Sequence, residues 1–115
     1  MKRYRLTELP DTHEGHILTG VISGRYINKG TMSYKPPGFR THPEGNHVHD
    51  DEEIFVILQG KAQMEVDGEL IPLEVGDVLV IEPGEEHYLI SDEEDPCINL
   101  WFHAGPERHP DQVKQ

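Results

Sequence analysis

Two histidines separated by a single residue, His47 and His49, are the side chains of this sequence best placed to do chemistry. Alternate residues of an extended strand point to the same face, so the two imidazoles would project together. Imidazole is the commonest protein ligand for transition metals, and a carboxylate supplies compensating negative charge. Glu53 opens the next apolar run, and His87 follows the turn at 83–86. The pattern indicates a metal site, although a pair of this kind also occurs on an ordinary polar strand face.

The elements that must position these side chains are short strands. Runs rich in Val, Ile, Leu, Phe and Tyr recur at about 8–12-residue spacing, which is typical of an all-β sandwich or barrel. The expected strands are Glu53–Gln59, Lys61–Val66, Glu69–Leu73, Asp77–Ile81, His87–Ser91 and Cys97–His103, with weaker ones at His16–Ser23 and Thr31–Lys35. Asp67-Gly68 predicts a hairpin because this pair tolerates the positive φ of a type I′ turn.

The strand expected at Glu53–Gln59 is apolar on both faces. Phe55 and Ile57 lie on one face, and Ile54, Val56 and Leu58 lie on the other. A strand of a lone barrel is usually polar outside, so this one needs cover on both sides. Another sheet or a second subunit would provide it.

The segment around the two histidines resembles the first sequence motif of the cupin superfamily, His-x-His-x3-Glu-x6-Gly. His47, His49, Glu53 and Gly60 match its fixed positions. The opening glycine of the family motif falls at Thr41.

The second cupin motif, Gly-x5-Pro-x-Gly-x2-His-x3-Asn, aligns on Gly76, Gly84 and His87. Its proline falls at Glu82, with Pro83 next to it, and its terminal asparagine falls at Ser91. None of the departures affects a metal ligand of the family. The resemblance extends over Thr31–His103.

This resemblance implies a double-stranded β-helix, or jelly roll, formed by residues 31–104. An N-terminal arm with strands would occupy 1–30, and a flexible tail would occupy 105–115. It also implies one divalent transition metal held by His47, His49, Glu53 and His87. Three imidazoles and one carboxylate suit Mn, Fe, Ni, Co, Cu or Zn, and the ligands alone do not rank these metals.

Four further residues are candidates for a substrate pocket. Phe55 and Leu89 share strand parity with two of the expected ligands, so they should line the cavity. His103 would reach the pocket mouth or face solvent, and Arg40 would meet a substrate carboxylate or pair with acidic neighbours. Trp101 is expected in the core or at a dimer contact rather than as a platform for substrate. No separate acid–base residue is identified.

The net charge of -12 argues against nucleic-acid binding, because the phosphates would be repelled. No apolar run approaches the roughly 20 residues of a membrane helix. The single Cys97 fits a cytoplasmic protein. Residues 1–40 carry seven basic and three acidic side chains, whereas 41–115 carry three basic and nineteen acidic ones. We therefore expect the N-terminal strands to pack against an acidic barrel, its own or that of a partner in a homodimer.

The leading functional hypothesis is a metal-dependent enzyme acting on a small organic molecule, of the dioxygenase, decarboxylase or isomerase type. The alternative is a non-catalytic module that binds or senses a small ligand. Fold alone does not decide between them.

Overall fold

The computed structural model describes residues 1–9, 26–41 and 50–105 of the chain. These residues form eight strands and one short 3-10 helix, η1 (Leu6–Glu8). The strands are β1 (Lys2–Arg5), β2 (Tyr26–Lys35), β3 (Glu52–Gly60), β4 (Ala62–Val66), β5 (Glu69–Leu73), β6 (Asp77–Ile81), β7 (His87–Ser91) and β8 (Cys97–Gly105). The all-β expectation is confirmed. Among the described residues, no helix is long and apolar enough to cross a membrane.

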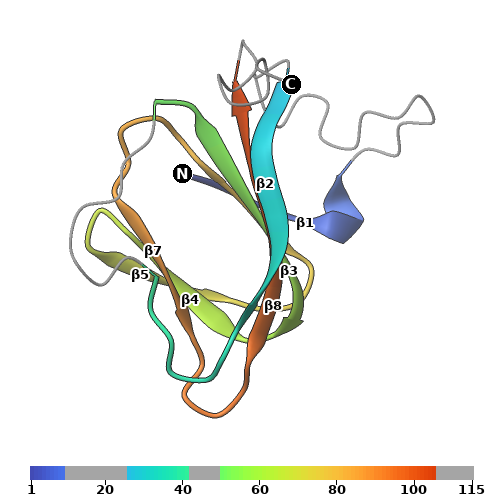
Figure 1. Ribbon diagram of the computed structural model, residues 1–115, viewed down its shortest axis with the longest axis vertical. Helices are drawn as coiled ribbons and strands as arrows, with labels where there is room; N and C mark the ends of the chain where they lie inside the picture. The colour runs from blue at the N-terminus through green and yellow to red at the C-terminus, as the bar shows by residue number, and fades with distance from the viewer. Residues whose placement is uncertain (10–25, 42–49, 106–115) are drawn as a thin grey trace.

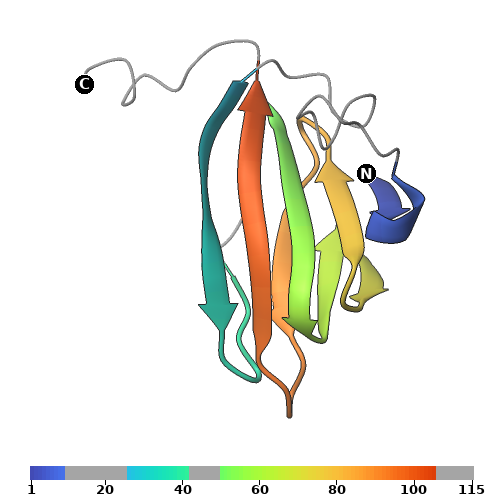
Figure 2. The same cartoon turned by 90° about the vertical axis from the view of Figure 1, so that its right-hand side faces the viewer.

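Two antiparallel sheets face each other, as Figure 1 shows. The larger has the order β1-β6-β3-β8-β2, and the smaller has the order β5-β4-β7. In Figure 2 the strands β2, β8 and β3 run side by side, with β6 and β1 beyond them. This is the expected jelly roll.

The space between the sheets holds the main apolar core. Its buried side chains come from both sheets: Phe55, Ile57, Ala62, Met64, Val66, Ile71, Leu73, Leu79, Ile81, Leu89 and Cys97. The β4–β5 hairpin turns at Asp67 and Gly68, both with positive φ, as the sequence predicted. Its first strand alternates between buried and more exposed residues, which places Met64 in the core.

The outer face of the larger sheet holds a second apolar cluster. It comprises Ile54, Val56, Val78, Val80, Phe102 and Ala104, with Tyr4 and Leu9 packed against it. The described N-terminal residues therefore contribute cover for β3 on the side away from the main core. Leu58 differs from the expectation, because an irregularity between Ile57 and Gln59 interrupts the pairing with β8 and Leu58 remains partly exposed.

The N-terminal arm binds its own barrel. Strand β1 pairs with β6, from Lys2 opposite Val80 to Arg5 opposite Asp77. This strand is absent from the sequence-based expectations. The strand expected at Thr31–Lys35 begins earlier, at Tyr26, and therefore runs across the expected boundary at position 30. The strand expected at His16–Ser23 and the tail after position 105 lie outside the described residues.

Candidate functional site

Glu53 and His87 meet inside the barrel, although they are carried by opposite sheets. Glu53 lies near the start of β3 and His87 begins β7. Glu53 Oε1 is 2.6 Å from His87 Nε2, and the two residues are only 4% and 2% exposed. The structure thus brings together two of the four expected metal ligands. The other two, His47 and His49, lie outside the described residues, as do His13, His16, His42 and His109.

The other ring nitrogen of His87 fixes how this pair is arranged. His87 Nδ1 lies 3.0 Å from the backbone oxygen of Glu85. A carbonyl oxygen only accepts, so Nδ1 carries the hydrogen and donates it. In the neutral ring, Nε2 then presents a lone pair toward the carboxylate of Glu53. Two acceptors at this distance require a proton or another cation between them.

The protonation of His87 follows from the same geometry. Burial disfavours the charged ring, but the hydrogen bond and negative charge of Glu53 outweigh it, so the pKa of His87 is raised above its usual value. The site therefore attracts positive charge. A divalent cation that binds there must displace this proton.

A third titratable side chain, His103 on β8, adjoins the pair. Its Nε2 lies 3.6 Å from Glu53 Oε1, and its Nδ1 lies 2.9 Å from Asp51 Oδ1. The residue is buried, and its ring packs edge-on against Trp101. The sequence analysis placed His103 at the pocket mouth but assigned no acid–base residue, and the Asp51–His103 pair is a candidate for that role. The contact of His103 with Glu53 depends on the β3–β8 register, which is not apparent from spacing.

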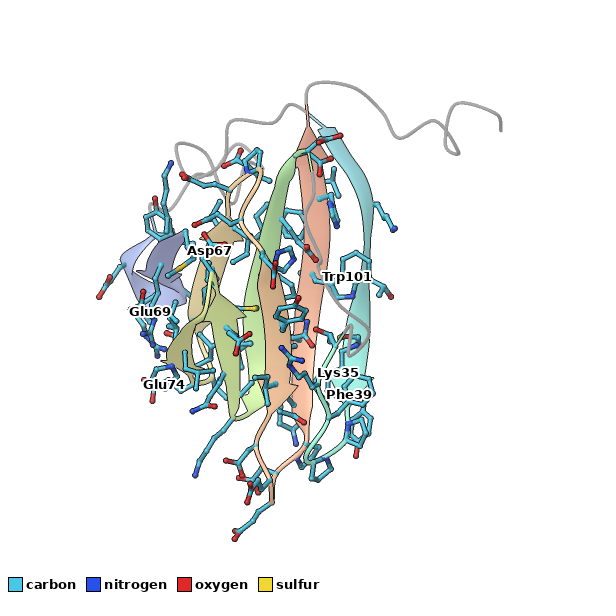
Figure 3. The ribbon with its side chains drawn as sticks, turned by 90° about the vertical axis from the view of Figure 1, so that its left-hand side faces the viewer. Lys35, Phe39, Asp67, Glu69, Glu74 and Trp101 are labelled. Atoms are coloured by element: carbon cyan, nitrogen blue, oxygen red, sulfur yellow. The ribbon has the colours of Figure 1, made fainter. Side chains whose placement is uncertain are left out.

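A cavity of about 460 Å³ opens beside these groups. Its walls are Lys29, Lys35, Phe39, Thr41, Glu53, Phe55, His87, Leu89, Asn99, Trp101 and His103. Phe55, Leu89 and His103 thus lie where a pocket was expected. In Figure 3, Lys35 and Phe39 lie together, with Trp101 further along the same side of the barrel.

Arg40 is not among the residues that line the cavity. Its guanidinium stacks 4.2 Å from the centre of the Tyr88 ring and lies 3.2 Å from Glu65 Oε2. Of the two roles expected for Arg40, the structure therefore shows pairing with an acidic neighbour. Six lining residues had no pocket role in the sequence-based expectations: Lys29, Lys35, Phe39, Thr41, Asn99 and Trp101. For the four that lie on β2 and β8, strand parity was the available signal.

Within the described part of the chain, no group of three histidine, cysteine or acidic side chains has the arrangement of a complete metal site. The cavity nevertheless combines a buried acid–imidazole pair with aromatic walls. Ligand sites are commonly concave, mostly apolar and furnished with a few convergent polar groups. The arrangement can therefore hold a cation at one end and a small organic molecule beside it.

Comparison with known proteins identifies the family. The sequence model described as "Cupin domain" matches residues 30–103. The chain belongs to the cupin family. The match runs from the middle of β2 through most of β8 and contains every residue that lines the cavity except Lys29.

Solved cupin structures share this fold. A cupin protein from Bacteroides fragilis is 30% identical, with a TM-score of 0.61, and the match covers 66% of this chain and 64% of that one. A predicted oxalate decarboxylase from Thermotoga maritima is 28% identical, with a TM-score of 0.55 over 64% of this chain and 62% of that one.

One curated relative is a regulator. The uncharacterized HTH-type transcriptional regulator YdiP of Escherichia coli K12 is 40% identical over 54 residues, which is 46% of this chain. This cupin spans 18% of that relative's length.

Proposed function

We propose that this cupin binds one divalent transition metal through His47, His49, Glu53 and His87, and that it is a metal-dependent enzyme acting on a small organic molecule. The observation that carries the proposal is the buried contact between Glu53 and His87 at the wall of the cavity. His47 and His49 are included because their spacing matches the family motif. Mn, Fe, Ni, Co, Cu and Zn all suit this ligand set.

The two described donors fit such a cation. Nitrogen and oxygen ligands lie about 2.0–2.2 Å from a transition metal, so two at right angles are roughly 3 Å apart. The Glu53 and His87 atoms are 2.6 Å apart and need to separate only slightly. The Glu85 carbonyl already directs the lone pair of His87 Nε2 toward the site. When bound, the metal supplies Lewis acidity or a site for dioxygen.

Residues of the cavity would surround the substrate and supply it with a proton. Phe55, Leu89 and Trp101 provide apolar walls that exclude water from part of the cavity. His103, oriented by Asp51, can hold or release a proton at Nε2 beside Glu53. A decarboxylase or isomerase needs such a proton donor. Similarity to a predicted oxalate decarboxylase is compatible with this class of reaction.

The alternative function is a non-catalytic module that senses a small ligand. It is favoured by the 40% identity to part of an HTH-type regulator. The same cavity would then hold an effector rather than a substrate. A cytoplasmic location agrees with both functions and with the single free, buried Cys97.

We also propose that the protein is a homodimer that buries the apolar end of the larger sheet. Met32 lies opposite Leu100, and Tyr34 lies opposite Ile98, so the four side chains share one face. Met32 and Tyr34 are 65% and 60% exposed. Within the described residues, β2 is also an edge strand of its sheet. A second copy, related by two-fold symmetry, would cover both the edge and the apolar face.

The metal proposal is tested by stripping the protein with a chelator and reloading it separately with each candidate metal. Elemental analysis should find one metal per chain. Glu53→Gln and His87→Ala should each weaken binding at least tenfold, because each removes a ligand. Glu69→Gln, an exposed carboxylate on β5 far from the cavity, is the matched control (Figure 3). Full metal occupancy in both site variants would refute the assignment.

Turnover separates enzyme from sensor. The loaded protein is supplied with oxalate, catechols and diketones, while oxygen uptake and carbon dioxide release are followed. Turnover that disappears in His87→Ala supports the enzyme. Tight binding of a panel compound without turnover with any metal would contradict it and favour the sensor.

A further inference from the structure

Asn99 on β8 carries a buried hydrogen-bond donor without a partner. Its side chain is fully buried and contributes to the cavity wall. Its Oδ1 accepts a hydrogen bond of 3.0 Å from Ser33 Oγ, which fixes the orientation of the amide. Among the described residues, Asn99 Nδ2 is the buried side-chain polar atom that has no partner. Buried donors are nearly always satisfied, so this one indicates a ligand acceptor or a bound water.

A lysine stands beside this donor. Ser33 lies opposite Asn99, and Lys35 lies opposite Cys97, so Lys35 and Asn99 are diagonal neighbours on the cavity face of β2 and β8. Lys35 also lines the cavity, and its Nζ is 5.4 Å from the centre of the Phe39 ring. It makes no ion pair with any residue in the described ranges, whereas Lys2, Arg3, Arg5 and Arg40 all do.

The charge of this wall contrasts with that of the whole chain. The protein carries a net charge of -12, yet two lysines, Lys29 and Lys35, line the cavity. The one acidic side chain among the lining residues is Glu53, which the proposed function assigns to the metal. Two cationic side chains on the wall of one cavity favour the binding of a small anion there.

We propose that the substrate is an organic carboxylate whose carboxylate group binds between Asn99 Nδ2 and Lys35 Nζ. This inference rests on the proposed function only in taking the cavity as the substrate site. An amide N–H and an ammonium group are both donors, and together they match the two acceptor oxygens of a carboxylate. The aromatic walls at Phe55 and Trp101 lie along the cavity from this end, where they accommodate an apolar body.

The β3–β8 register also limits the size of this substrate. Glu53 lies opposite His103, whereas Ile57 lies opposite Asn99. Four residues along a strand span about 13 Å. A molecule that contacts both the Glu53–His87 end and the Asn99 end is therefore much longer than a two-carbon acid. An acid with a ring or a medium-length chain fits these dimensions.

The test measures binding of 3-phenylpropionate by calorimetry, with its neutral amide, 3-phenylpropanamide, as the uncharged comparison. It is performed on chelator-treated and on metal-loaded protein. The carboxylate should bind at least tenfold more tightly than the amide in both forms. Oxalate should bind more weakly than 3-phenylpropionate to the chelator-treated protein, because it cannot reach the apolar walls from the Asn99 end.

Variants locate the carboxylate. Lys35→Gln, at a half-buried position, should weaken carboxylate binding about tenfold without changing amide binding, and Asn99→Asp should weaken it further by repulsion. Lys61→Gln, an exposed lysine that does not line the cavity, should bind like the parent. Equal affinity for acid and amide, or unchanged binding in Lys35→Gln, would overturn this inference. If the parent protein binds the carboxylate but takes up none of the candidate metals, the anion site is supported and the proposed metal function is refuted.

Discussion

At the scale of single residues, the site depends on one chain of contacts from Asp51 through His103 and Glu53 to His87. Each interior group has a neighbour that orients it: Asp51 holds His103, and the Glu85 carbonyl holds His87. Orienting contacts of this kind fix which nitrogen faces the centre. These contacts hold His87, which we propose as a metal ligand, and His103, which we propose as a proton carrier, in fixed orientations.

A second buried carboxylate, Asp77, stabilises the fold, and we expect this stabilisation to depend on pH. Its oxygens accept hydrogen bonds from Arg5 at 2.6 Å, from Arg3 at 2.7 Å and from the backbone N–H of Glu74 at 2.9 Å. Burial alone would raise the pKa of Asp77, but these bonds and the arginine charges outweigh it and lower the pKa. Asp77 thus joins β1 to β6 through charge as well as through the backbone.

Replacing Asp77 with asparagine should lower the free energy of unfolding by about 2 kcal/mol at neutral pH, the typical value of hydrogen bonds to a charged group. Because folding lowers the pKa of Asp77, its stabilisation is complete above about pH 4 and is lost as pH falls through the folded-state pKa. Urea unfolding at a series of pH values should show the difference between parent and Asp77→Asn shrinking in acid. Asp95→Asn, in an exposed loop, serves as control. A deficit that stays constant down to pH 2 would contradict this role.

At the scale of elements, the sequence was informative where local chemistry decides the structure. Asp67-Gly68 predicted the hairpin because the turn needs positive φ, and strand parity predicted that Phe55 and Leu89 face inward. Strand β1 could not be predicted, since it is four residues long, three of them are basic, and it is held by distant β6. The same holds for the pocket position of Asn99 and for the contact between His103 and Glu53, because both depend on the register between strands far apart in sequence.

Gly60, the glycine that ends the first motif, is the last residue of β3, and the backbone there leaves no room for a side chain. Gly60 has a φ of +84°, and a Cβ at this position would collide with the backbone oxygen of Pro96, just before β8. Gly68 has a similar φ of +85°, but open space surrounds its Cα. Substitutions at these two positions therefore distinguish the cost of backbone strain alone from the cost of strain combined with a steric collision.

Gly68→Ala should lower the free energy of unfolding by about 1 kcal/mol, because alanine is strained in the left-handed backbone conformation. Gly60→Ala should cost roughly 3 kcal/mol, since overpacking adds to the same strain. Denaturant unfolding of the two variants gives the comparison. Equal losses would show that the approach of Pro96 to Gly60 does not constrain the fold.

At the scale of the whole molecule, the charged residues of the N-terminal arm and the apolar face of the larger sheet have different roles. The basic N-terminal arm neutralises its own barrel: Arg3 and Arg5 bind Asp77, and Lys2 lies 3.5 Å from Glu82. The described arm residues therefore act within the chain. The apolar face at Met32, Tyr34, Ile98 and Leu100 is the one that we propose a second copy covers.

Light scattering coupled to size exclusion should give a mass about twice the 13.1 kDa of the chain. Met32→Glu should shift the protein to the monomer, because it places a charge in the centre of the proposed interface. Leu70→Glu changes another exposed apolar residue, in the other sheet, and should leave the dimer intact. A monomeric parent, or a dimer insensitive to Met32→Glu, would refute the interface.

The central claim is that a metal lies between Glu53 and His87, and anomalous diffraction from a metal-loaded crystal tests it most directly. Data collected on either side of the absorption edge identify the element and its position. We expect one peak per chain, within about 2.3 Å of both the Glu53 carboxylate and His87 Nε2. A loaded crystal whose anomalous peak lies elsewhere, or that shows none between these two side chains, would contradict it.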